Sequence, residues 1–137
     1  MLEFHDPIPK LAGKVCVQFL AQEYWHGSER VSPANALLLH LDDGQWHRFF
    51  IDAGVVFWRS ESDQASLPPT DEAHRYILAD LGERYGIVGR TVSKVHTTDL
   101  PDGGEIRLEF SGAPGVILRD RRDKAELEIS TDVTSTA

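Results

Sequence analysis

The stretch HLDDGQWH, residues 40–47, places a histidine on either side of a short polar turn. Imidazole nitrogens are common metal ligands, so His40 and His47 are the first candidates for chemistry. Whether the two rings could act together depends on the turn between them. If Asp43 and Gly44 alone form a two-residue type I′ turn, the histidines face each other across the hairpin, with Cβ atoms about 5 Å apart.

A three-residue loop over residues 42–44, with a glycine bulge, is the alternative turn. In that register His40 lies opposite Trp46, and His40 and His47 point to opposite faces of the sheet. Even a facing pair would lack a third ligand at a reliable spacing, which makes it weak evidence for zinc. We therefore predict no metal site and no cofactor here.

The triplet Asp-x-Gly occurs between apolar runs at residues 42–44, 52–54 and 102–104. In each triplet we expect Asp to bond the backbone ahead of it and Gly to take the left-handed conformation. Asp52, a lone acid within FFIDAGVVFW, is thus interpreted as a turn residue rather than a catalytic carboxylate. The repetition favours the bulged loop at residues 42–44, and the same loop at residues 52–54 would place Phe49 near Phe57.

The run QWHRFFI, residues 45–51, carries aromatic side chains on both faces of a predicted strand. Such a strand is expected to be covered on both sides within the core. The alternative is a small β-barrel whose aromatic cavity binds a small molecule, with or without catalysis. The ligand-binding residues would then be Trp46, His47, Phe49 and Phe57.

The stretch EYWHGSER, residues 23–30, has the composition of a recognition loop between two strands. Its Ser, His and Glu lie too close in sequence to form a catalytic triad. Trp25 is the candidate anchor for a partner, and the alternative is a plain connection with Trp25 folded onto the core.

Acidic residues are concentrated in residues 61–83, which contain six acids against Arg75 and so account for −5 of the net charge of −8. This balance disfavours a nucleic-acid partner, because a phosphate backbone requires a basic surface. It permits a basic protein partner, and the alternative is that the acids only confer solubility. The candidate partner-binding residues are Glu61, Asp63, Asp71, Glu72 and Trp25.

Short β-branched and aromatic runs separated by Gly, Pro and Asp indicate a mainly β (α+β) fold. We expect an antiparallel meander, bent sheet or half-barrel of about eight strands, at residues 14–21, 36–41, 45–51, 55–59, 91–97, 105–110, 116–119 and 125–130. One helix is predicted at residues 71–85, with Thr70 as N-cap and Gly86 just past its end. The run RYILADL could instead be a strand followed by a short helical turn.

The length of 137 residues fits one domain, which we place at residues 1–130 with a flexible polar tail at 131–137. The lone cysteine, Cys16, is expected to be buried. No apolar run predicts a membrane span and no signal peptide is evident, so we expect a cytoplasmic protein. Sequence motifs of known enzyme classes are absent, which favours a non-enzymatic, inhibitor-like, immunity-like or adaptor domain. The sequence leaves the oligomeric state open, including a homodimer formed through an edge strand.

Overall fold

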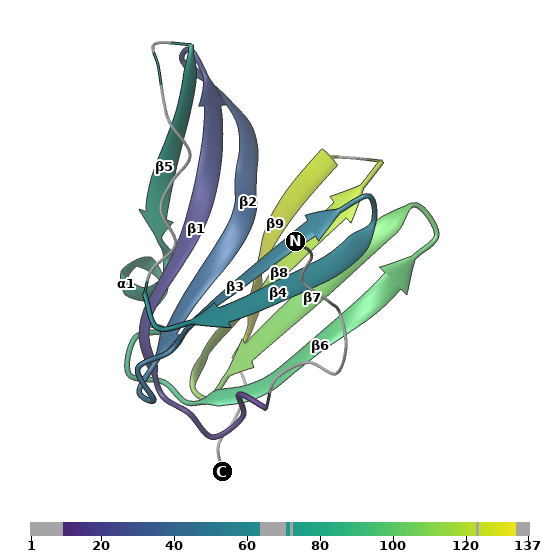
Figure 1. The fold of residues 1–137 in the computed structure, drawn as a ribbon. Coiled ribbons are helices and arrows are strands. Elements are labelled where there is room, and N and C mark those ends of the chain that lie inside the picture. The colour runs from purple at the N-terminus through teal and green to yellow at the C-terminus, as the bar shows by residue number, and fades with distance from the viewer. Residues whose placement is uncertain (1–9, 64–70, 72, 123, 134–137) are drawn as a thin grey trace.

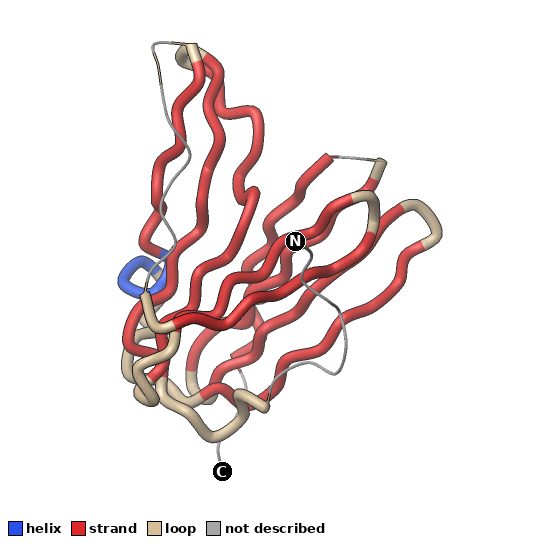
Figure 2. The backbone as a smooth tube through the Cα atoms, in the orientation of Figure 1, coloured by secondary structure: helices blue, strands red, loops and turns tan. Residues whose placement is uncertain are grey.

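The computed structural model describes residues 10–63, 71, 73–122 and 124–133 (Figure 1). The chain is mainly β, as predicted, and its two antiparallel sheets are not closed into a barrel. The sheets are built from β1 (Cys16–His26), β2 (Glu29–Leu41), β3 (Trp46–Asp52), β4 (Val55–Glu61), β5 (His74–Asp80), β6 (Val92–Leu100), β7 (Gly103–Phe110), β8 (Ala113–Arg121) and β9 (Lys124–Val133), with helix α1 at Leu81–Arg84. Strands dominate the backbone in Figure 2. Among the described residues, no helix has the length and apolar character needed to cross a membrane.

Each sheet is mostly a meander of neighbouring strands. The first has the order β4-β3-β2-β1-β5 and the second the order β6-β7-β8-β9. Every predicted strand overlaps one of these strands, and the meander of β2, β3 and β4 follows from short turns. The exception to simple order is β5, which crosses over to pair with β1.

The main core lies between the two sheets. Alternate residues of β2 and β3 meet alternate residues of β7 and β8, as expected for strands with one buried face. Phe19 and Phe110, both fully buried, join the sheets with ring centroids 5.6 Å apart. Cys16 is buried as predicted, and this burial raises the pKa of its thiol to about 12.

Part of the first sheet extends beyond this core, except for Ala34, which is still packed in it. We call it the wing: residues 22–35 and 73–78, at the end of β1, the start of β2 and the start of β5. β2 pairs with β3 only at residues 37–40, so residues 29–36 have β1 as their neighbour on one side alone. Figure 1 shows these strands diverging from the second sheet. The wing therefore exposes both of its faces more than the rest of the sheet does.

The predicted helix at residues 71–85 is wrong over most of its length. Residues 74–80 form β5, and α1 is limited to residues 81–84. Seven cross-strand pairs join β5 to β1, and this non-local pairing overrides the local helical pattern. Asp80 caps the helix α1, because its Oδ1 accepts a hydrogen bond from the backbone N–H of Glu83. The predicted N-cap, Thr70, lies outside the described residues. The alternative of a strand followed by a helical turn is the correct one.

The three Asp-x-Gly turns differ from one another. The loop at residues 42–44 is bulged as predicted, because Leu41 bonds Gln45 across it. At residues 52–54 the prediction is wrong: Asp52 pairs with Val55, and the two central residues, Ala53 and Gly54, both have positive φ. This is type I′ geometry, which shifts the register by one residue and brings Phe57 opposite Phe50 instead of Phe49.

The third triplet was also predicted wrongly. Leu100 pairs with Gly103, so the turn residues are Pro101 and Asp102, and Gly103 and Gly104 belong to β7. Close packing explains these glycines: a Cβ on Gly103 would lie 1.7 Å from the backbone oxygen of Asp120. They are needed for space at this position, and neither adopts the left-handed conformation.

Candidate functional site

The two histidines of the opening hairpin do not share a face. His40 stacks on Trp46 with ring centroids 4.5 Å apart and an interplanar angle of 9°. His47 is 4% exposed, and its Nδ1 lies 2.7 Å from the Ser60 hydroxyl. Burial lowers the pKa of His47, so its ring is neutral at physiological pH. The pair forms no common site, as the bulged register predicts.

The acidic segment is divided between distant parts of the fold. Glu61 ends β4 opposite Trp46, whereas Asp71 precedes β5 beside the tip of the wing. Eleven residue steps along β2 separate Glu29, at the tip of the wing, from His40, which pairs with Trp46, and they correspond to about 36 Å of extended strand. Asp63 follows Glu61 closely, and Glu72 lies outside the described residues. Of the candidate partner-binding residues that the structure describes, Asp71 and Trp25 belong to the same region.

Trp25 lies on β1, where that strand pairs with both β2 and β5, rather than in the predicted loop. β1 and β2 join through a turn at Gly27 and Ser28, with His26 paired to Glu29. Trp25 Nε1 donates a hydrogen bond to Glu23 Oε1 at 2.9 Å, and Arg30 Nη1 lies 3.4 Å from the other oxygen of that carboxylate. The guanidinium of Arg75 lies 5.5 Å from the Trp25 ring centroid. This face of the wing is an ordered layer of stacked and hydrogen-bonded groups.

The opposite face of the wing carries four rings from two strands. Tyr24 and His26 of β1 pair directly with Tyr76 and His74 of β5. The Tyr24 and Tyr76 ring centroids are 5.2 Å apart, and those of His26 and His74 are 5.1 Å apart. The backbone N–H groups of His74 and Ala73 hold the pKa of the Asp71 carboxyl below its usual range. An ionised carboxylate thus lies beside this aromatic face.

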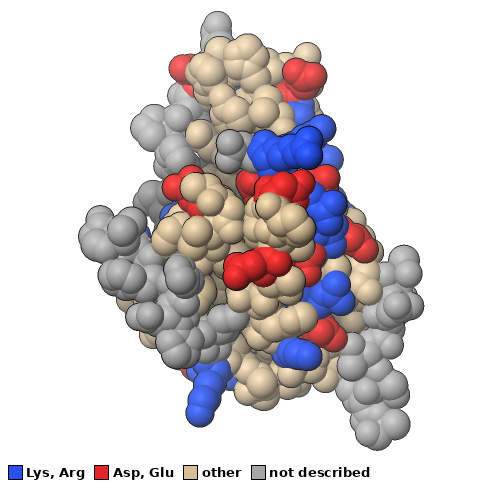
Figure 3. Space-filling model, turned by 90° about the vertical axis from the view of Figure 1, so that its right-hand side faces the viewer, with Lys and Arg blue, Asp and Glu red and all other residues tan. Residues whose placement is uncertain are grey.

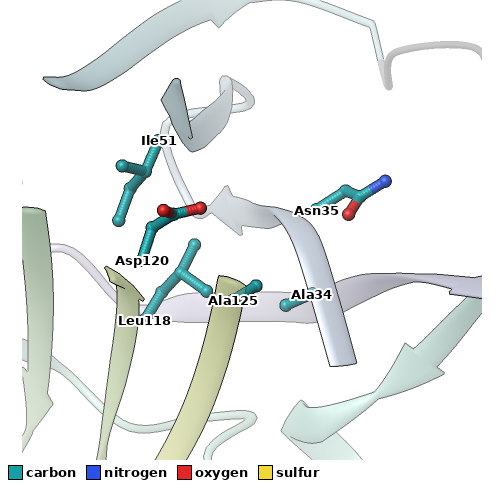
Figure 4. A pocket seen from close by; sticks show the side chains of 6 residues that line it. All are labelled: Ala34, Asn35, Ile51, Leu118, Asp120 and Ala125. Atoms are coloured by element: carbon teal, nitrogen blue, oxygen red, sulfur yellow. The ribbon is translucent and has the colours of Figure 1, made fainter. Parts of the chain in front are cut away.

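A groove runs between β2 and the end of the β8–β9 hairpin. It contains a cavity of about 290 Å³ lined by Tyr24, Val31, Ser32, Asn35, Asp120, Lys124 and Ala125. A second cavity of about 120 Å³ continues it and is lined by Ala34, Asn35, Ile51, Leu118, Asp120 and Ala125. Figure 4 shows Asp120 and Ile51 converging there while Asn35 points away. The groove combines hydroxyl, amide, carboxylate and ammonium groups over small apolar side chains.

A wider hollow of about 530 Å³ lies at the hairpin ends, lined by Ala53, Gly54, Asp99, Leu100, Asp102, Gly103, Asp120 and Arg122. None of these three cavities is lined by the predicted ligand-binding residues. Phe49 is fully buried in the main core, while Trp46 packs with Leu20 and Leu38 in a smaller cluster. The aromatic strand is therefore divided between two packed faces, with Phe57 stacked on Phe50.

Charges on the side of the molecule shown in Figure 3 are mixed in sign, with blue and red side chains interspersed. Arg119 lies within 4 Å of three carboxylates, those of Glu105, Glu126 and Glu128. Mixed charges of this kind indicate a solvated face with paired side chains.

Comparison of the chain with models of protein families, with curated proteins and with solved structures finds no match.

Sequence reasoning missed two features of the structure. One is the groove, and the other is the set of four rings on one face of the wing, from Tyr24, His26, His74 and Tyr76. His74 and Tyr76 are far from His26 and Tyr24 in the sequence, and they were assigned to a helix. Exposed and half-buried residues alternate only weakly along β5. The signal that could have placed His74 beside another strand is the run RYILADL, for which a strand was the alternative prediction. The groove has no local signal, because its walls come from both sheets.

Proposed function

We propose that this protein is a non-enzymatic binding domain that engages a protein partner through the wing, in the manner of an inhibitor, an immunity protein or an adaptor. The main support is the composition of the wing beyond the core: Tyr24, Trp25 and Tyr76 are half-buried, and two aliphatic side chains, Val31 and Ile77, are exposed. Aromatic and arginine side chains supply much of the binding energy at protein interfaces. Arg30 and Arg75 are the arginine side chains that the wing supplies.

The partner we propose is basic. The net charge of −8 attracts a basic protein and repels nucleic acid. Asp71 contributes an ionised carboxylate at the wing, and the remaining acids act at longer range, where salt screens them. The protein is proposed to act in the cytoplasm, and a homodimer formed through an edge strand is the alternative partner.

Four exposed aliphatic residues allow a matched test. Val31 and Ile77 lie in the wing and are 53% and 38% exposed, while Val17 and Val88 lie outside it and are 45% and 38% exposed. Each is changed to Arg, which adds the same charge at an exposed position in every variant. Tagged wild-type and variant proteins are incubated with native lysate at low salt, washed with graded salt and analysed by mass spectrometry.

The expected result is a basic protein that is retained by wild type, by Val17→Arg and by Val88→Arg, released by salt, and lost with Val31→Arg and Ile77→Arg. Equal retention by all five proteins would place binding outside the wing. Equal loss in all four variants would indicate a non-specific charge effect. Either result, or no retained protein, would overturn the proposal.

The groove supports a second candidate function, the binding of a small polar molecule. Its lining includes Ser32, Asn35, Asp120 and Lys124 around a cavity of about 290 Å³. A thermal-shift screen of small polar compounds tests this, with Ala125→Leu as the variant that narrows the groove. A compound that raises the melting temperature of wild type but not of Ala125→Leu would support this function, and a screen with no such compound would reject it.

A further inference from the structure

The tip of the wing holds two histidines in a fixed relationship. His26 and His74 form the last cross-strand pair of β1 and β5, with ring centroids 5.1 Å apart and an interplanar angle of 54°. Beyond this pair, the backbone N–H of Gly27 donates to the carbonyl of Ala73 at 2.8 Å. Arg75 Nη2 donates to the carbonyl of Gly27, also at 2.8 Å. The β1–β5 pairing on one side of the two imidazoles, and these two hydrogen bonds on the other, therefore hold the backbone that carries them.

The ring of His74 is also oriented. Its Nδ1 lies 2.6 Å from the Tyr24 hydroxyl, and the two rings are stacked with an interplanar angle of 4°. When Nδ1 donates its proton to that oxygen, Nε2 carries a free lone pair. Histidines that bind metal ions have this arrangement, in which an oxygen on the second nitrogen fixes the tautomer and the ring orientation.

The separation of the rings fits joint coordination. A metal ion held about 2.0–2.1 Å from one nitrogen of each imidazole, at a tetrahedral angle, places the ring centroids about 5 Å apart. The observed 5.1 Å is compatible with this geometry, and the two rings are tilted by 54° to each other. Both histidines are exposed, so an ion can reach them from solvent.

A carboxylate lies beside the pair. Asp71 Oδ1 accepts hydrogen bonds from the backbone N–H groups of Ala73 and His74 at 2.8 and 2.7 Å, which fixes its position next to His74. Asp71 interacts electrostatically with both His26 and His74. The nearest arginine of β5, Arg75, is directed to the other face, where it stacks on Trp25.

We propose that His26 and His74 together bind one divalent transition-metal ion of the Zn²⁺ and Cu²⁺ class, with Tyr24 as the residue that positions His74. No group of three or more His, Cys, Asp or Glu within the described part of the chain is arranged to hold a metal ion. The pair therefore supplies two ligands, and water or a side chain of a bound partner completes the coordination. Imidazole favours these metals over Mg²⁺, and Cu²⁺ binds more tightly than Zn²⁺ to a given set of nitrogen ligands.

The test is calorimetric titration of purified protein with Zn²⁺ and with Cu²⁺, with Mg²⁺ as the negative control. The variants are His26→Ala, His74→Ala and Tyr24→Phe, and the matched controls are His40→Ala and His96→Ala, which remove histidines elsewhere in the fold. Circular dichroism melting without metal establishes that each variant is folded. Electron paramagnetic resonance of the Cu²⁺ form counts the coordinated imidazole nitrogens.

We expect one ion per chain, two coordinated imidazoles and tighter binding of Cu²⁺ than of Zn²⁺. Either His26→Ala or His74→Ala abolishes this metal binding, and Tyr24→Phe weakens the affinity about 10- to 100-fold. The control variants His40→Ala and His96→Ala leave the affinity unchanged. Binding that persists in both His26→Ala and His74→Ala, or no binding by wild type, would overturn the proposal. If the pair variants do not fold, the Tyr24→Phe affinity and the nitrogen count in wild type decide the outcome. This test needs no partner protein, so it can succeed or fail independently of the proposed function.

Discussion

Arg119 Nε lies 2.8 Å from Glu105 Oε1, and both side chains are largely buried on the second sheet. Arg119 also contacts Glu128, at 3.1 Å. The Glu105 carboxylate, in turn, accepts its hydrogen bond from Arg119. These contacts with carboxylates raise the pKa of Arg119. The two partners of the ion pair therefore differ in what their removal leaves behind.

Replacing Arg119 by Met is expected to destabilise the protein by about 2–3 kcal/mol, because the buried carboxylate of Glu105 loses its partner. Glu105→Gln keeps an acceptor and leaves Arg119 paired with Glu128, and we expect a loss of about 1 kcal/mol. Glu126→Gln, at an exposed 3.7 Å contact, is the control and should cost less than about 0.5 kcal/mol. Urea unfolding measures all three, and equal losses for Arg119→Met and Glu105→Gln would contradict this reading.

Gly103→Ala should be among the most destabilising small substitutions in the chain. The added methyl group would lie 1.7 Å from the backbone oxygen of Asp120, which cannot move without disturbing the β7–β8 ladder. We expect a loss of about 3 kcal/mol or more, measured by denaturant unfolding. Gly44→Asn is the control, because that site is open and Asn tolerates the left-handed conformation, and its cost should stay below about 1 kcal/mol. A Gly103→Ala loss no larger than the control would refute the packing argument.

The buried ring of His47 predicts a pH dependence of stability. Burial lowers its pKa in the folded protein from the ordinary value of 6.5, so below that pH the unfolded chain takes up a proton that the folded chain does not. The free energy of unfolding should therefore fall as the pH drops below about 6.5, by up to about 1.4 kcal/mol per pH unit from this group. Urea titrations at pH 7, 6 and 5 measure the slope, which His47→Gln should reduce and His40→Gln should retain. An unchanged slope in His47→Gln would show that other groups are responsible.

Cys16 should be inert to thiol reagents in the folded protein. Its side chain is 1% exposed, and a pKa of about 12 leaves almost no thiolate at pH 8. Reaction with a chromogenic disulfide should be fast in guanidinium and slow in native buffer. The control is Val17→Cys, an exposed neighbour that adds one rapidly reacting thiol. Rapid labelling of wild type under native conditions would contradict the burial of Cys16.

Local patterns predicted much of this fold. The eight predicted strands coincide with apolar runs of matching period, and the bulged loop at residues 42–44 follows from turn chemistry that acts over five residues. The same chemistry failed at residues 52–54, because Ala53 adopts a positive φ that Ala seldom takes. Propensity alone did not indicate that a two-residue turn would form there.

By itself the sequence determined the antiparallel β class and the burial of Cys16, because each depends on alternation within a few residues. It favoured, but did not decide, the hairpin register that separates His40 from His47. Tertiary structure alone decided that residues 74–80 form a strand, since the hydrogen bonds that stabilise β5 come from β1, about fifty residues away. That pairing also brought His74 beside His26 and Tyr24, and the packing of the two sheets created the groove at Asp120. Contacts between distant segments gain their free energy only when the chain is folded, and no local pattern in the sequence reports them.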